Sequence, residues 1–336
     1  MSKLRIGLIG AGGIGAHHAA RYNRVQGAEL TAVVDVDEAR ANAVAKEHGV
    51  PRVFTSVESA LQSGAFDAVD ICLPTWLHAE VTVAAANAGL HVLCEKPMAT
   101  TLEEADAMIS AARKAGVVLM IAQCRRYDNY WGTVRRALAE GAIGSPVVWR
   151  DVAGSNGPGP AWFYDRRKGL GPLVDGAIHN YDFARTMFGE ATSVYATGRS
   201  FKPVTAPDTG IAVVRFEKGD ELQLSWSWGL PQGVRTQHAL EILGPRGVLY
   251  FSPPSFIKAP ECPEGWRQIV VVREGGEVVP YQYQVNDMYV DEIQAFVDAV
   301  AGKRAPDPDG EEAKTSLAIA MAVLESIERG GIVTLK

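Results

Sequence analysis

Residues 4–15 read LRIGLIGAGGIG, an apolar run followed by the glycines of a G-x-G-x-x-G pattern at Gly10, Gly12 and Gly15. The apolar run predicts a buried strand, and the glycines stand where that strand would turn into a helix. In this pattern the first glycine permits a tight turn, the second lets a pyrophosphate approach backbone N–H groups, and the third allows close packing of helix and strand. The stretch therefore predicts the opening βαβ unit of a dinucleotide-binding fold.

Asp35 supports the same interpretation, because it ends the second apolar run 20 residues beyond Gly15. A carboxylate there would accept hydrogen bonds from the adenosine ribose hydroxyls and would repel a 2′-phosphate. The next two residues, Val36 and Asp37, bring no Arg or Lys that could hold such a phosphate. The pattern favours NAD over NADP as the cofactor.

Short strand-like runs alternate with helical stretches up to residue 124, which is typical of βαβ units on a parallel sheet. We expect strands over residues 4–9, 30–35, 52–54, 68–72, 91–94 and 117–122. Beyond residue 125 strands separated by turn signals predominate, with helices expected over 130–140, 173–188, 288–301 and 311–329. The fold class expected is α/β. A Rossmann domain over 1–124 would carry a doubly wound parallel sheet, and an α+β domain over 125–336 an open, mostly antiparallel one.

Composition excludes several other classes of protein. The formal net charge of −6 at pH 7 gives no basic face for nucleic acid or for an anionic membrane. No run approaches the ~18 apolar residues of a membrane span. The four cysteines stand apart without metal-ligand spacing, so we expect reduced thiols, no metal site and a cytoplasmic protein.

Two segments follow the fourth and fifth strands, at the sheet edge where open α/β sheets bind their ligands. The first runs from Leu73 to His78, and the second is Glu95-Lys96-Pro97. Lys96 could be a solvated lysine paired with Glu95, but its place beside the expected nicotinamide site favours a functional ammonium. His78 could line the cofactor or merely begin a helix.

A second constellation, Asp175 and His179, follows the glycine-rich stretch 168–172. The i, i+4 spacing would put both side chains on one face of the expected helix, and Asp182 would extend that face. The segment could instead be a solvated acidic surface with an incidental histidine, or a weak metal site. Neither alternative explains a carboxylate and an imidazole directly after a flexible loop in a chain with a dinucleotide fingerprint.

These motifs together resemble the glucose-fructose oxidoreductase, inositol dehydrogenase and MocA-type family of NAD(P)-dependent enzymes. The resemblance extends over nearly the whole chain and rests on the fingerprint, NAGLHVLCEKP over 87–97, RRYD over 125–128, GAIG over 141–144, and GLG over 169–171 leading to Asp175 and His179. The family usually has a glycine triplet before the Asp, where this chain has Leu170 in the middle.

The resemblance implies that Lys96, Asp175 and His179 form the catalytic set. His179 would act as general base, Lys96 would stabilise the developing alkoxide, and Asp175 would orient the base. The second domain would supply the substrate pocket and the interface of a homodimer or homotetramer. The expected activity is hydride transfer between NAD and a hydroxylated small molecule, such as a sugar, a keto-sugar or a cyclic polyol like inositol.

The remaining candidates are grouped by the ligand they would contact. Cofactor contacts are expected from Gly10, Gly12, Gly13, Ile14, Gly15, Asp35, Val36, Leu73, Pro74, Thr75, His78, Glu95, Lys96 and Trp162. Substrate contacts are expected from Lys96, Arg125, Tyr164, Asp175, His179, Asn180 and Tyr283, with Trp162 also able to line the cleft. Trp162 and Tyr164 could equally be interface or core aromatics.

Two other functions fit the same motifs. A regulatory protein could sense the dinucleotide without catalysing a reaction, since fold does not fix function. A redox-neutral lyase or glycosidase could use tightly held NAD to form a transient ketone. The presence of Lys96, Asp175 and His179 together argues against a pure sensor.

Overall fold

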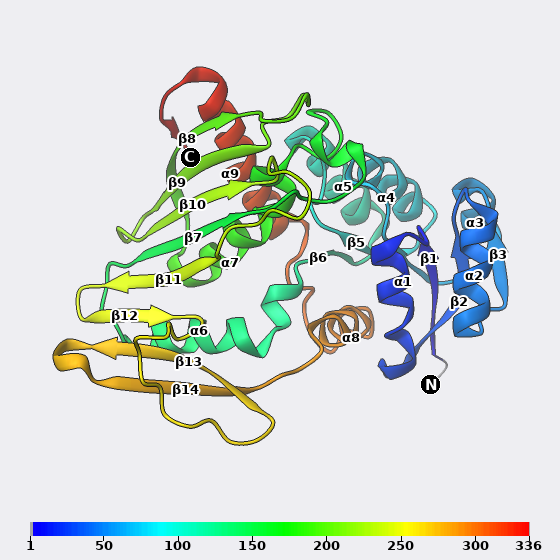
Figure 1. Cartoon of the computed structure of the whole chain (residues 1–336). Helices are drawn as coiled ribbons and strands as arrows, with labels where there is room; N and C mark the ends of the chain where they lie inside the picture. Colours follow the sequence, from blue (N-terminus) through cyan, green and yellow to red (C-terminus); the bar gives the residue numbers. More distant parts are fainter. Residues whose placement is uncertain (1–2, 336) are drawn as a thin grey trace. The chain divides into compact units, whose positions relative to one another are not determined.

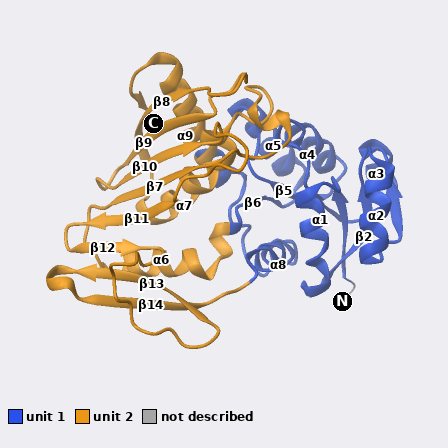
Figure 2. Cartoon of the chain, viewed as in Figure 1, with its two compact units in different colours: residues 1–124, 287–315 blue, residues 125–286, 316–336 orange. Residues whose placement is uncertain are grey.

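A computed structural model describes residues 3–335 of the chain (Figure 1). The chain divides into two compact units, residues 1–124 with 287–315 and residues 125–286 with 316–336 (Figure 2). The sequence predicts a single division after residue 124. The return of 287–315 to the first unit corrects that expectation, because a late segment that packs on an early sheet leaves no local mark in the sequence.

The first unit contains a six-stranded parallel sheet in the order β3-β2-β1-β4-β5-β6, which confirms the predicted doubly wound fold. Its strands are β1 (Leu4–Ile9), β2 (Ala28–Val34), β3 (Arg52–Phe54), β4 (Ala68–Ile71), β5 (His91–Glu95) and β6 (Leu119–Ala122). Strand order reverses between β1 and β4. Ligands of such sheets bind beyond the carboxyl ends of the strands at this reversal.

Three helices of the first unit begin at a residue whose side chain caps them. The helices of this unit are α1 (Gly13–Ala19), α2 (Glu38–His48), α3 (Val57–Gln62), α4 (His78–Asn87), α5 (Leu102–Ala115) and α8 (Met288–Val300), with short helices η1 (Tyr22–Arg24) and η2 (Thr75–Leu77). At α5, the Thr101 hydroxyl accepts from the Glu104 N–H at 3.1 Å, and Glu104 accepts in return from the Thr100 N–H at 2.9 Å. This reciprocal arrangement is a capping box displaced by one residue, and it fixes the start of the helix.

The second unit contains a nine-stranded sheet in the order β14-β13-β12-β11-β7-β10-β9-β8-β15. Its strands are β7 (Val148–Gly154), β8 (Ala191–Arg199), β9 (Thr209–Phe216), β10 (Glu221–Ser227), β11 (Ala239–Gly244), β12 (Gly247–Tyr250), β13 (Trp266–Arg273), β14 (Val278–Gln284) and β15 (Val333–Thr334). Only the β7–β10 pair is parallel, so the mostly antiparallel sheet is confirmed. The sequence predicts strands over 147–152, 193–199, 209–217, 221–228, 238–244 and 268–273 in this unit, and it does not predict β12, β14 and β15.

Helices cover one face of this sheet, as Figure 1 shows for α6, α7 and α9. The elements are η3 (Cys124–Tyr127), α6 (Asn129–Ala139), η4 (Ala161–Tyr164), a π-helix η5 (Pro172–Gly176), α7 (Ile178–Phe188), η6 (Glu274–Gly276) and α9 (Gly310–Arg329). The core between helices and sheet includes Trp131, Trp149, Phe183 and Val323. Side chains on the other face stay accessible, with Ile211 at 52% exposure. This alternation is what a sheet covered on one side requires.

Among the described residues, none of the helices combines the length and apolar character needed to cross a bilayer.

Candidate functional site

The fingerprint glycines differ in what surrounds them. Gly10 has φ +98°, and a Cβ there would lie 2.5 Å from the carbonyl oxygen of Cys72. A Cβ on Gly15 would lie 1.9 Å from the carbonyl oxygen of Gly10. Both contacts are with backbone atoms that cannot swing away, so these positions admit only glycine. The predicted roles of the first and third glycines, in the turn and in helix–strand packing, thus have a steric basis.

Gly12 and Gly13 have the opposite surroundings, because a Cβ on either would meet no atom within 4 Å. The space beside the turn is therefore open where the second glycine should admit a pyrophosphate to the backbone. The residues present fit a dinucleotide, with the closed positions shaping the turn and the open ones facing the ligand.

Asp35 closes the turn at the end of β2 and is 8% exposed. Its carboxylate accepts from the Ala11 N–H at 2.8 Å and from the Asp37 N–H at 2.9 Å. Arg40 also lies 3.5 Å from Asp35 and 3.1 Å from Asp37. The two residues after Asp35 do not reveal this cation, because the first turn of α2 brings Arg40 back to the carboxylate.

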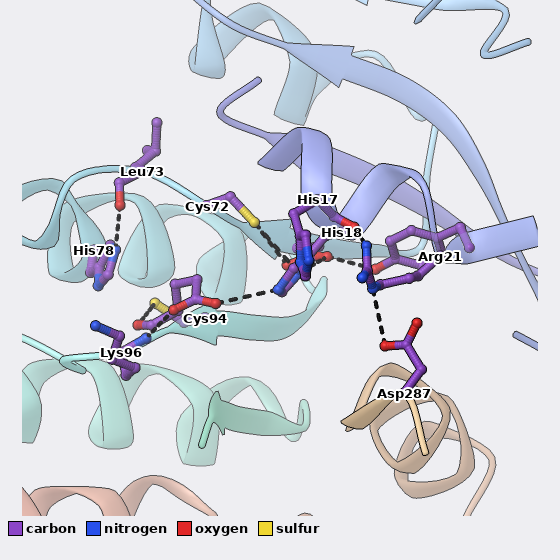
Figure 3. Close-up of polar contacts among 12 residues, drawn as sticks. His17, His18, Arg21, Cys72, Leu73, His78, Cys94, Lys96 and Asp287 are labelled. Carbon is purple, nitrogen blue, oxygen red and sulfur yellow. Dashed lines mark hydrogen bonds and ion pairs between the residues drawn. The ribbon is translucent and has the colours of Figure 1, made fainter. Parts of the chain in front are cut away.

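Lys96 follows β5 directly and is half-buried. Its backbone N–H donates to Glu95 Oε2 at 3.0 Å, so the carboxylate before the lysine folds back onto the turn (Figure 3). Glu95 is itself 6% exposed. Glu95 is therefore not a solvated partner for Lys96 at the surface, and the functional role of Lys96 stays a prediction.

His78 begins α4, and its ring is enclosed between two loops. The ring nitrogens lie 2.8 Å from the Pro97 carbonyl oxygen and 2.7 Å from that of Leu73. Burial lowers the pKa of His78, although its hydrogen bonds to Leu73 and Pro97 oppose that change. With both nitrogens against protein carbonyls, the imidazole ties the two loops together, and its predicted contact with the cofactor stays a prediction.

Asp175 and His179 do not lie on one regular helix. Asp175 is buried in the π-helix η5, and half-buried His179 lies in the first turn of α7. The expected continuous helix over 173–188 is therefore wrong. The preceding loop needs left-handed backbone at Leu170, with φ 65°, and at Gly171, with φ +80°. Leu170 adopts there the conformation for which glycine is favoured.

Asn180, the neighbour of His179, is fully buried within a polar network of the second unit. Its amide donates to Asp151 at 2.5 Å, and its side-chain oxygen accepts from Arg125 at 3.0 Å. Asp151 also accepts from the Trp226 indole at 3.1 Å and from His238 at 2.8 Å. Arg125 and Asn180, both predicted substrate contacts, thus lie together. Asp151, Trp226 and His238 were not predicted, because no local pattern links residues on two strands and in the loop before a third.

Asp182 does not extend an open face with Asp175. It is 1% exposed and forms a two-point ion pair with Arg126 at 2.8 and 2.7 Å. Ser316 donates to the same carboxylate at 3.0 Å. The expectation that Asp182 extends the face of Asp175 is therefore wrong, because the Asp182 carboxylate is buried and bonded to Arg126 and Ser316.

The predicted aromatic contacts lie in different surroundings. Tyr164 is buried, and its hydroxyl is 2.8 Å from the Asn156 carbonyl, so it pins the Gly- and Pro-rich loop after β7. Trp162 is half-buried and stacks on Phe163 with 3.6 Å between ring centroids. Tyr283, on β14, packs beside Tyr130, with 5.6 Å between the ring centroids. Their contacts with ligands stay predictions.

One cluster in the first unit has the chemistry of a metal site, although the sequence predicts none. Ligand atoms of His18, Asp70 and Cys72 all lie within 4.8 Å of one another. They already bond to each other and to Tyr22: His18 Nδ1 is 2.9 Å from Asp70, and the Tyr22 hydroxyl donates to Asp70 at 2.8 Å. The Cys72 thiol forms no disulfide.

The first unit combines a doubly wound sheet, a glycine turn with open space beside it, and a buried carboxylate that accepts a hydrogen bond from the backbone of that turn. These are the features of a dinucleotide-binding protein. The chain belongs to the oxidoreductase family with the NAD-binding Rossmann fold, whose model matches residues 4–123, and the GFO/IDH/MocA C-terminal domain matches residues 131–250. Both the resemblance drawn from the sequence and the NAD-binding class are confirmed.

Individual relatives cover the chain almost end to end. The myo-inositol 2-dehydrogenase of Thermotoga maritima is 30% identical over 97% of this chain and 96% of its own. The D-xylose 1-dehydrogenase (NADP+) 2 of Haloferax volcanii is also 30% identical, over 99% and 100%. A Bordetella pertussis dehydrogenase solved with NADH and UDP-GlcNAcA is 25% identical, with a TM-score of 0.81 over 99% of both chains.

Proposed function

We propose that this protein is an NAD-dependent dehydrogenase that oxidises a CH–OH group of a sugar or cyclic polyol, or reduces the corresponding ketone. The observation that carries the proposal is Lys96, held by a buried carboxylate at the carboxyl end of β5, in a sheet with an NAD fingerprint. Relatives with inositol and xylose dehydrogenase names support the substrate class.

The roles follow from the chemistry of three side chains. His179 takes the hydroxyl proton, because an imidazole titrates near neutral pH and can return the proton in the reverse direction. The Lys96 ammonium stabilises the oxygen as negative charge develops on it. Asp175, four residues before His179, orients the imidazole. NAD, when bound, supplies the nicotinamide that accepts the hydride.

Removal of the base tests the proposal. We expect His179→Ala to lower kcat by about 100- to 10,000-fold, the usual contribution of general acid–base catalysis, while calorimetry finds NAD affinity unchanged. His48→Ala is the matched control, since His48 ends α2 far along the sequence from any proposed role. Turnover of His179→Ala equal to that of wild type would reject the assignment.

A substrate panel separates the alternatives. Incubation with NAD and a set of polyols and aldoses, followed by absorbance of NADH, should show turnover with at least one compound. A dinucleotide sensor would bind NAD without turnover of any compound. A redox-neutral enzyme would convert substrate with no net NADH. Repeating the panel with NADP tests the effect of Arg40 beside Asp35.

The assembly and location are proposed on narrower grounds. We expect a homodimer or homotetramer formed through the open face of the large sheet, where Ile211 and Tyr195 are 52% and 46% exposed. We expect the cytoplasm, because Cys72, Cys94 and Cys262 form no disulfide. Light scattering of the purified protein measures the first, and cell fractionation the second.

A further inference from the structure

The backbone around Lys96 is held on both sides by a buried histidine of the first unit. On the preceding side, Glu95 lies 3.3 Å from His18 Nε2. On the following side, the carbonyl oxygen of Pro97 lies 2.8 Å from His78 Nδ1. Figure 3 shows both rings together with Lys96. The two histidines come from different helices, α1 and α4.

His18 links the ends of two strands. It is 0% exposed, and its Nδ1 lies 2.9 Å from Asp70 on β4 while its Nε2 faces Glu95 on β5. Burial alone lowers the pKa of His18, but Cys72 and Asp70 beside the ring raise it more, so the net pKa lies well above its usual value. A charged imidazolium between two carboxylates is therefore the stable arrangement, since each buried charge then has a partner.

Glu95 transmits this link to Lys96. One carboxylate oxygen, Oε1, faces His18, and the other, Oε2, accepts the Lys96 backbone N–H at 3.0 Å. The contact with His18 has the distance of an ion pair without the geometry of a hydrogen bond, and the attraction between the two charges holds Oε1 beside the ring. The backbone of Lys96 is thus fixed relative to β4 as well as to β5.

His78 forms the matching link beyond Lys96. Its Nε2 lies 2.7 Å from the Leu73 carbonyl oxygen, in the loop after β4, and its Nδ1 faces Pro97. Carbonyl oxygens only accept, and a neutral imidazole carries one N–H, so the ring donates to one of the two carbonyls at a time while it packs against both. Both histidines therefore join the end of β4 to the turn after β5, one on each side of Lys96.

We propose that His18 and His78 are positioning residues that hold the Lys96 ammonium in its working place by clamping Glu95 and Pro97. The inference rests on the proposed role of Lys96, and it assigns to neither histidine a contact with the reacting atoms. A displacement of about 1 Å of such a group costs on the order of 100-fold in rate. Two clamps on consecutive neighbours limit that displacement in both directions along the chain.

Amide substitutions can keep one half of each link and remove the other. The Asn side-chain nitrogen is bonded to Cγ, as Nδ1 of histidine is, whereas the Gln nitrogen reaches the place of Nε2. His18→Gln therefore keeps an N–H group facing Glu95 but not the positive charge, and His18→Asn keeps only the bond to Asp70. At position 78 the pattern reverses, because His78→Asn keeps the bond to Pro97 and His78→Gln keeps only that to Leu73.

The expected result is a crossed pattern. We expect kcat to fall about 10- to 100-fold in His18→Asn and His78→Gln, and to fall by a smaller factor in His18→Gln and His78→Asn. Hydrogen exchange of the Lys96 amide, measured by mass spectrometry without cofactor, should speed up roughly tenfold in the two impaired variants only.

A merely structural role would give the same loss for both amides at each position, and that outcome overturns the proposal. If both position-18 proteins fail to fold, Glu95→Gln tests the same link, since it keeps the side-chain shape and removes the charge facing His18; an unchanged kcat and exchange rate would overturn the proposal. Lys96→Met distinguishes the proposed role of Lys96 from the proposed role of the two histidines. Wild-type turnover in Lys96→Met refutes the role of Lys96 itself, whereas an inactive Lys96→Met without the crossed pattern refutes only the clamp.

Discussion

The glycine turn of the first unit and the Asn180 network of the second are both polar, closely packed regions, but they are specified in different ways. In the turn, each glycine is needed for a local steric reason. Gly15 leaves room for the Gly10 carbonyl, and Gly12 leaves the space open in which a ligand can approach the backbone. In the network, Asn180 depends on Asp151, 29 residues away, and through it on His238. Steric constraints between residues close in the sequence appear as a sequence motif, whereas contacts between side chains far apart in the sequence do not.

The largest effect is expected at the turn itself. Gly15→Ala would place a Cβ 1.9 Å from a backbone oxygen, so we expect a loss of more than about 4 kcal/mol in unfolding free energy, or no folded protein. Gly13→Ala meets no atom within 4 Å and should stay within about 1 kcal/mol of wild type. Urea unfolding without cofactor measures both. Equal losses in the two variants would show that the turn is not specified by steric contact.

The Arg126–Asp182 ion pair is marked by no sequence motif, but it should contribute nearly as much to the unfolding free energy as the glycine turn does. Arg126→Met would leave the Asp182 carboxylate, 1% exposed, without its cation, at an expected cost of about 3–5 kcal/mol. The double variant Arg126→Met with Asp182→Leu should recover most of that loss, because no buried charge then remains. Urea unfolding of the two proteins makes the comparison. A double variant as unstable as the single one would mean that packing, not charge, sets the cost.

The same contrast explains what could be predicted from the sequence. The strands of the Rossmann sheet were predicted because β-branched runs and glycine turns are local signals. The helix through Asp175 was predicted as continuous, but the sequence does not reveal a π-turn that the left-handed backbone at Leu170 and Gly171 introduces. His18 belongs to the helix that follows the glycine fingerprint, but its partner Glu95 is 77 residues away along the sequence. Only the fold brings them together.

Glu292 is a further buried ionisable group that the sequence does not reveal, and its effect on stability should depend on pH. It is 0% exposed, and neither carboxyl oxygen has a hydrogen-bond partner among residues 3–335. Burial, with the nearby charge of Glu95, raises the pKa of Glu292 well above its usual value. Between the usual and the raised pKa, the folded protein holds a proton that the unfolded chain has lost. Stability should therefore fall as pH rises through this window, by up to about 1.4 kcal/mol per pH unit.

Glu292→Gln should remove that slope, so its advantage over wild type grows with pH. Unfolding free energies from urea titrations at several pH values between 5 and 8, taken roughly one unit apart, measure the difference in slope. Glu47→Gln, at an exposed position on α2, is the control and should leave the slope unchanged. Parallel curves for wild type and Glu292→Gln would mean that the Glu292 carboxyl does not change its protonation on unfolding.

The smallest effect is expected at the exposed end of the Asn180 network. The His238 side chain is 50% exposed, and Asp151 keeps its bonds to Asn180 and Trp226 when His238 is removed. We therefore expect His238→Ala to cost less than about 1 kcal/mol in unfolding free energy, as for an exposed ion pair. Asn180→Ala should cost more, because it leaves both Asp151 and Arg125 short of a buried partner. Urea unfolding at matched pH and salt compares the two variants. A larger loss in His238→Ala would make the surface histidine, rather than the buried amide, the centre of the network.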